Sequence, residues 1–131
     1  MNPKPHLLIA LLTLGAFLGT GIFIRVNIAD ITEMGDAVRF QYRANHVLLL
    51  MAGLLHLLLW RTNQAQLGWS FGRRIGSIFA IASVPILLVA FFVEPPKGIP
   101  ERHITSAGVI ILTIGVVFSA LPTRRNKRNV E

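Results

Sequence analysis

The sequence contains no cysteine, which excludes disulfide bonds, thiolate metal sites and catalysis by a thiol. Charge is also scarce, because only 15% of the 131 residues are charged, against about 25% in soluble domains. Hydrophobic residues make up 53% of the chain, and the mean hydropathy is +0.59. The composition therefore indicates an integral membrane protein, and the length fits one structural domain, residues 1–131.

Four apolar stretches are long enough to cross a bilayer as helices, which takes about 17 to 25 mostly apolar residues. They run from Leu7 to Ile24, Ala44 to Trp60, Ile75 to Val93 and Ile104 to Leu121. The short connections between them make consecutive helices antiparallel neighbours. We therefore predict an all-α membrane protein, a four-helix transmembrane bundle.

The distribution of Lys and Arg predicts which side of the bundle faces the cytoplasm. The termini and the middle loop together carry eight cationic residues and one acid, whereas the other side carries five of each sign. We therefore expect both termini in the cytoplasm, with residues 122–131 as a basic tail. The net charge of +7 then lies on one membrane face. No nucleic-acid partner is needed to explain it, and the pattern fits a bacterial inner-membrane protein.

The connection at residues 27–39 is longer than a turn requires. Ile28, Ile31, Met34 and Val38 recur in it at near-helical spacing. A short interfacial helix on the outer surface and a plain polar loop both fit this pattern.

The second stretch has a polar side and a leucine side. At about 100° per residue, one side of the helix carries Tyr42, Asn45, His46, Leu49, Gly53, His56 and Trp60. The opposite side carries Leu48, Met51, Leu55, Leu58 and Leu59. Because polar groups are costly in lipid, we expect the leucines to face the acyl chains and the polar side to face the other helices.

His56 lies more than a turn inside the apolar stretch, so we expect a neutral imidazole that is hydrogen-bonded to another helix. The candidate partners are Thr13, Thr20, Ser83 and Thr113. Two roles fit His56: a structural contact between helices, or the handling of a ligand or proton.

A second polar group lies at the outer end of the same stretch. It consists of Tyr42, Arg43, Asn45 and His46, with His103 at the start of the fourth stretch on the same side. These donors fit an anion, a lipid headgroup or a quinone carbonyl. Arg and Tyr also anchor helices at the headgroups, which is the plainer interpretation.

Small residues at four-residue spacing predict close packing inside the bundle. The candidates are Gly15 and Gly19 in the first stretch, Gly53 in the second, Gly76 in the third and Gly115 in the fourth. Pro85 lies in the middle of the third stretch, where its missing N–H predicts a kink. Ser83 or a neighbouring helix is expected to satisfy the freed carbonyl.

Three sharper functions find less support. The histidine positions argue against two haems. His46 and His56 lie about 15 Å apart along one helix, so two haems bound there would crowd each other. His6 is expected at the headgroups and not inside the bundle. A single haem remains an alternative.

The spans contain no Asp or Glu, which a proton- or cation-coupled carrier usually needs. A small channel or transporter formed by an oligomer of the chain is the other alternative. Enzyme activity and a cofactor are not predicted, since no catalytic motif is present.

The interpretation that remains is a binding role. We predict an accessory or assembly subunit of a membrane complex, or a protein that binds lipid or quinone at the outer end of its second helix. Its partners would be membrane lipids, other membrane proteins or a second copy of the chain. Replacing Arg43 or His46 with alanine is expected to weaken such an association and to leave membrane insertion intact.

Overall fold

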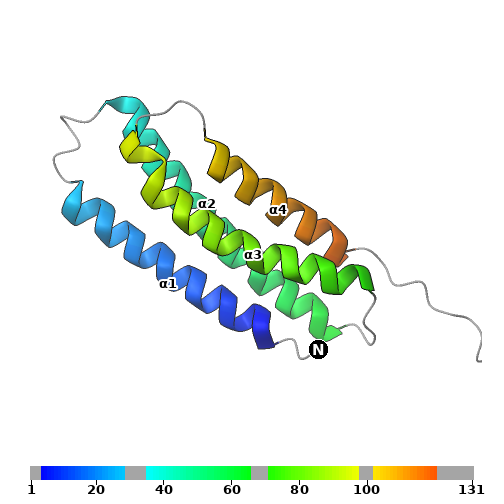
Figure 1. The fold of residues 1–131 in the computed structure, drawn as a ribbon. Coiled ribbons are helices and arrows are strands. Elements are labelled where there is room, and N and C mark those ends of the chain that lie inside the picture. The colour runs from blue at the N-terminus through cyan, green and yellow to red at the C-terminus, as the bar shows by residue number, and fades with distance from the viewer. Residues whose placement is uncertain (1–3, 29–34, 66–70, 98–101, 121–131) are drawn as a thin grey trace, which may run out of the picture.

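A computed structural model of the chain describes residues 4–28, 35–65, 71–97 and 102–120. Its elements are α1 (Lys4–Asn27), α2 (Asp36–Ala65), α3 (Phe71–Val93), the short 3-10 helix η1 (Pro95–Lys97) and α4 (His103–Ala120). The four α-helices run up and down in one elongated bundle (Figure 1). All four are long and apolar enough to cross a membrane, which confirms the predicted all-α fold with four candidate membrane spans.

Helix α2 is longer than its predicted span. The prediction began at Ala44, where the apolar residues begin, whereas the helix begins at Asp36 and ends at Ala65. Asp36 lies in the first turn, where its negative charge complements the positive end of the helix dipole, and it pairs with Arg39. The first turns of α2 therefore extend beyond the apolar segment, because hydropathy marks the bilayer and not the helix end.

The predicted interfacial helix between the first two spans falls largely outside the described residues, since it includes residues 29–34. Its flanks are described. Ile28 is buried and packs with Tyr42 and Phe91, and Val38 is part of α2. Both described ends of the connection therefore belong to the bundle.

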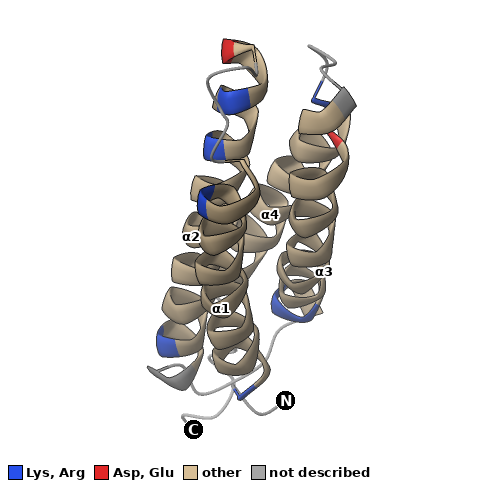
Figure 2. Ribbon diagram, turned by 90° about the vertical axis from the view of Figure 1, so that its left-hand side faces the viewer, with Lys and Arg blue, Asp and Glu red and all other residues tan. Residues whose placement is uncertain are grey.

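The outside of the bundle is apolar along its length, and its charges lie at the ends. Large apolar side chains such as Leu18, Ile22 and Ile110 are more than half exposed. Figure 2 shows the charged residues of the described chain at the two ends of the helices, with an uncharged middle. A bilayer accounts for this distribution, because acyl chains solvate leucine and cannot solvate a charge.

Helices α3 and α4 pack backbone to backbone at Gly76 and Gly115. A Cβ atom added at Gly115 would lie 2.5 Å from the backbone nitrogen of Ala80, and one added at Gly76 would lie 2.7 Å from the Gly115 carbonyl oxygen. Backbone atoms cannot turn aside as a flexible side chain can. Glycine at these two positions therefore permits a contact that helices in lipid use in place of the hydrophobic effect.

The other small residues of the spans have different surroundings. The expectation that Gly15 and Gly19 pack inside the bundle is wrong: both are exposed, and an added Cβ would meet nothing within 4 Å. Their spacing leaves one face of α1 without bulky side chains, but it does not determine which surface packs against that face. Gly53 is buried, and a Cβ there would lie 3.1 Å from the Leu14 side chain.

Pro85 lies on the exposed side of α3, and the helix continues through it. Its missing N–H deprives the carbonyl of Ile81 of a partner. The expectation that Ser83 satisfies this carbonyl is wrong, because the Ser83 hydroxyl donates a 2.7 Å hydrogen bond to the carbonyl oxygen of Ala80. A helical serine bonds three or four residues back, and Ile81 lies only two residues back.

Gly115→Ala is expected to destabilise the protein by about 1 to 3 kcal/mol, because the new methyl group forces α3 and α4 apart. Thermal unfolding of the purified protein in a mild detergent measures this. Gly19→Ala adds the same methyl group to an exposed face and is the matched control, which should unfold at the parent temperature. Equal unfolding temperatures for the two variants would contradict the backbone contact.

Candidate functional site

The polar side of α2 faces the other helices, as predicted. Its polar members Tyr42, Asn45 and His56 are buried, and His46 is half-buried. On the opposite side, Met51 and Leu58 are exposed. Leu59 is an exception, because it is buried although it was assigned to the lipid side. It lies three residues after His56, and residues three apart share a helix face.

His56 meets His6 near the end of the bundle where α1 begins. The two Nδ1 atoms are 3.0 Å apart. His6 Nε2 lies 2.9 Å from the hydroxyl of Ser77 on α3, and His56 Nε2 lies 3.1 Å from the carbonyl oxygen of Ala80. His6, His56 and Ser77, the inner histidine cluster, therefore tie three helices together.

The neutral cluster has only one consistent set of proton positions. The Ala80 carbonyl can only accept, so His56 carries its proton on Nε2 and its Nδ1 is an acceptor. His6 must then donate from Nδ1 to His56, which leaves the Nε2 of His6 to accept from the Ser77 hydroxyl. The hydrogen bonds therefore run in one direction, from Ser77 through His6 and His56 to Ala80.

The expectation that His6 lies among the headgroups is wrong. Helix α1 begins at Lys4, so His6 is already helical, and it is 2% exposed. Buried imidazoles need hydrogen-bond partners, and His6 has them on both nitrogens. The sequence contained one signal of this arrangement, namely a second histidine at the same end as His56.

The hydroxyl groups expected to bond His56 have other partners. The expected partners were Thr13, Thr20, Ser83 and Thr113. Thr13 and Thr113 donate to carbonyls one turn earlier in their own helices, as hydroxyls in apolar helices often do. Ser83 shares the Ala80 carbonyl with His56 but does not bond the imidazole itself.

His46 packs against α1 about midway toward the other end. Its Nδ1 lies 3.0 Å from the Thr20 hydroxyl, and its ring stacks on Phe17 with centroids 4.1 Å apart. Gly21 makes room for it, because a Cβ there would lie 3.1 Å from the imidazole. His46 therefore fills a place in the interface of α1 and α2.

Asn45 joins α2, α3 and α4 at the outer end. Its amide NH₂ donates to the carbonyl of Ala90 at 3.2 Å, and its oxygen lies 3.0 Å from the Thr105 hydroxyl, whose proton goes to Glu94. Arg102 also donates to this oxygen. Asn45 is 2% exposed, so its side chain is engaged inside the protein.

Glu94 caps the start of α4 from the end of α3. One carboxylate oxygen accepts the backbone N–H groups of Ile104 and Thr105 at 2.7 and 3.1 Å, and the other accepts from the Thr105 hydroxyl. Burial alone would raise the pKa of Glu94, but these hydrogen bonds and the nearby charge of Arg102 outweigh it, so the pKa lies below its ordinary value. The carboxylate is the anion that a helix N-terminus favours.

Glu94 is not among the site residues predicted from the sequence. An indirect signal existed, because Arg102 stands at the capping position of α4, where Ser, Thr, Asp or Asn is usual. A helix without a local cap needs a distant one. The chain folds back through η1 and supplies it.

The predicted outer group is only partly brought together. Tyr42 is buried, with its ring against Phe91. Arg43 and His103 are exposed, whereas Asn45 and His46 lie inside. Arg102, which was not among the predicted site residues, takes the position beside Asn45 that a combined cluster would have given to His103.

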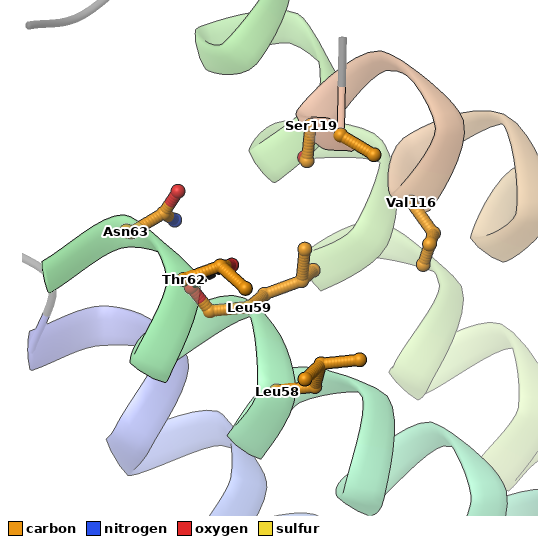
Figure 3. Close-up of a pocket in the computed structure, with 7 residues that line it drawn as sticks. Leu58, Leu59, Thr62, Asn63, Val116 and Ser119 are labelled. Carbon is orange, nitrogen blue, oxygen red and sulfur yellow. Dashed lines mark hydrogen bonds between the residues drawn. The ribbon is translucent and has the colours of Figure 1, made fainter. Parts of the chain in front are cut away.

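An apolar groove lies between α2 and α4. One cavity in it, of about 250 Å³, is lined by Leu48, Met51, Leu55, Val109, Leu112, Thr113, Val116 and Val117. A second, of about 180 Å³, continues toward the end of the bundle that holds the inner histidine cluster. It is lined by Leu58, Leu59, Thr62, Asn63, Val116, Ser119 and Ala120 (Figure 3). Val116 belongs to both cavities, so the two form one groove.

Two polar atoms at the end of this groove have no hydrogen-bond partner among the residues that the structure describes. They are the hydroxyl oxygen of Ser119 on α4 and the amide nitrogen of Asn63 on α2. Ser119 is 6% exposed. Figure 3 shows the two side chains on the facing helices, with Leu59 between them. A buried polar atom without a partner costs about 1 to 3 kcal/mol, so these two mark a place where a ligand atom would stabilise the protein.

The inner histidine cluster does not have the geometry of a haem site. An iron bonded to two axial imidazoles on opposite sides would hold the bonded nitrogens about 4 Å apart, since each bond is about 2 Å long. The facing nitrogens of His6 and His56 are 3.0 Å apart, which leaves no room between the rings for the iron of a haem. Among the described residues, no three His, Asp or Glu side chains gather as metal ligands.

Comparison with known proteins provides no further guide to function. The chain matches no protein-family model, no curated protein and no solved structure. Its function is therefore inferred from the polar clusters and the groove.

Glu94 should make the stability of the protein depend on pH. A carboxyl whose pKa is lower in the folded than in the unfolded state adds stability that is complete above the unfolded value, ordinarily 4.5, and is lost as the pH falls through the folded value. The unfolding temperature of the parent in detergent should therefore drop on acidification, and that of Glu94→Gln should drop less. Asp36→Asn removes an exposed carboxylate and should keep the parent response. Identical acid profiles for parent and Glu94→Gln would refute the cap.

Proposed function

We propose that this chain is a bacterial inner-membrane protein that binds a long-chain amphiphile with a carbonyl head, a quinone or an acyl lipid, between α2 and α4. Its role would be that of an accessory subunit that holds this molecule within a membrane complex. The observation that carries the proposal is the pair of unpartnered donors, Asn63 and Ser119, at the end of the apolar groove.

An orientation with both termini in the cytoplasm is supported by the charges. The described residues at the end where α1 begins include Lys4, Arg61, Arg73 and Arg74 and no acid. The opposite end mixes both signs. Cationic residues are retained on the cytoplasmic side during insertion, so the proposed head site lies toward the cytoplasm.

The chemistry of the head follows from the two donors. A serine hydroxyl and an amide NH₂ both donate, and a carbonyl oxygen only accepts. Quinone rings and acyl esters both carry carbonyl oxygens, so they share the chemistry that Asn63 and Ser119 offer. A hydrogen bond from either donor would remove the cost of leaving it buried and unpaired.

The groove suits the chain of such a molecule. It is lined almost entirely by aliphatic side chains, and from Leu48 to Leu59 it extends about 16 Å along α2. An acyl or isoprenoid chain has no polar atoms to satisfy there. Pockets for small molecules combine this apolar lining with a few fixed polar groups, as the groove does with Ser119 and Asn63.

The head site proposed here differs from the outer position favoured by the sequence. At the outer end, Asn45 and His46 are occupied by contacts within the chain, and Arg43 is the exposed cation that remains for a lipid headgroup. A contact of Arg43 with lipid stays a prediction, as does self-association through the exposed face of Gly15 and Gly19.

Binding is expected to require both the two donors and the open groove. In nanodiscs, Ser119→Ala or Asn63→Ala should weaken the binding of decylubiquinone about 5- to 10-fold, as expected for one lost hydrogen bond of about 1 to 1.5 kcal/mol. Val116→Phe should abolish it by filling the groove. Ile110→Phe adds the same bulk to an exposed face of α4 and should bind like the parent. Native mass spectrometry counts the bound molecules.

A parallel titration distinguishes a quinone from an acyl lipid as the molecule that carries the carbonyl. The same variants are titrated with dioleoyl phosphatidylglycerol in detergent, and the probe that the parent retains and Val116→Phe loses identifies the class. If neither probe distinguishes Val116→Phe from Ile110→Phe, the groove has no such ligand.

A further inference from the structure

The inner histidine cluster has no part in the proposed binding of an amphiphile. Its two imidazoles are buried to 2% and 0% exposure, and they bond each other directly. A helix contact alone would be met by serine or asparagine. Two facing imidazoles add nitrogens that can take up a proton, which a serine or an asparagine side chain does not do.

The directed hydrogen bonds determine where an added proton can bind. In the neutral cluster, the Nδ1 of His56 already accepts from His6, and the Nε2 of His56 already donates to Ala80. The remaining basic atom is the Nε2 of His6, which accepts from Ser77. When a proton arrives there, the Ser77 oxygen can accept in place of donating, because a hydroxyl does both. Every hydrogen bond of the cluster is kept.

We propose that His6 and His56 form a buried proton-binding site that takes up one proton through Ser77 and shares it across their facing Nδ1 atoms. Once Nε2 of His6 is protonated, the proton between the two Nδ1 atoms, which are 3.0 Å apart, can transfer from His6 to His56. The positive charge then passes from α1 to α2 while the number of added protons stays one.

The capacity is limited to one proton by geometry. A second proton would give both Nδ1 atoms an N–H, and the two hydrogens would face each other across 3.0 Å. Within the described ranges, the charged groups at this end are Lys4 on α1, Arg61 on α2, and Arg73 and Arg74 on α3. Helix α4 contributes none, and no carboxylate is present at this end among the described residues.

The site is a store for a proton and not a path across the membrane. The relay ends at the Ala80 carbonyl, which has no proton to pass on. Leu49 and Ala52 are both 0% exposed and lie on α2 between His56 and His46. The proton therefore enters and leaves at the end of the bundle where α1 begins.

Nitrogen NMR of the full chain in nanodiscs, with ¹⁵N-labelled histidine, tests this site without any substitution. At mildly alkaline pH, His6 should be protonated on Nδ1 and His56 on Nε2, with a ¹⁵N–¹⁵N coupling across the bond that joins them. Stepwise acidification of the folded protein should then add one imidazolium to the pair, not two. His46, bonded to a threonine, serves as the internal control that shows no such coupling.

Substitution gives a second test. His6→Gln should remove the coupling and the shared proton, while Thr20→Val, which alters the partner of His46, should leave the pair unchanged. The proposal fails if both histidines become charged together, if they share one tautomer without coupling, or if the folded parent takes up no proton at the pair.

Discussion

A bilayer offers no hydrogen bonds, so each polar side chain inside this protein must find its partner on another part of the same chain or on a ligand. The polar groups of α2 meet this requirement at three levels: Asn45 with α3 and α4, His46 with α1, and His56 with α1 and α3. Between these contacts the core is small and aliphatic. Hydrogen bonds of His6 and His46 hold α1 against α2 and α3, and Phe17 and Ile28 add apolar contacts with the core.

Two different kinds of contact hold the bundle together. Helices α3 and α4 are joined by close packing, because Gly76 and Gly115 bring the two backbones together. Glu94 caps the start of α4. Helix α1 is joined to its neighbours by hydrogen bonds of His6 and His46. The seam between α2 and α4 has neither kind of contact over most of its length, and the groove lies there. A ligand that fills this seam would join the two halves.

Much of the fold follows from the sequence, because the bilayer imposes one rule on every span. Length and hydropathy predicted the four helices, and the period of the helix predicted which side of α2 is buried. The failures share a cause. His6 and Glu94 each act through a partner distant in the chain, namely His56 and the start of α4. A periodic pattern shows which side of a helix is polar but not which residue lies opposite, so the pairing required the structure.

Buried polar side chains with hydrogen-bond partners and those without partners contribute differently to this protein. Asn45 and Glu94 are hydrogen-bonded inside the chain at the outer end, so these residues stabilise the bundle. Ser119 and Asn63 are the reverse, because each leaves a buried polar atom without a partner among the described residues, and such an atom is a liability in lipid. The inner histidine cluster lies between these extremes: its bonds are complete, yet its imidazoles can still accept a charge without breaking any of them. The two proposed binding sites of this bundle therefore lie where polar atoms lack hydrogen-bond partners or where the hydrogen bonds can change direction.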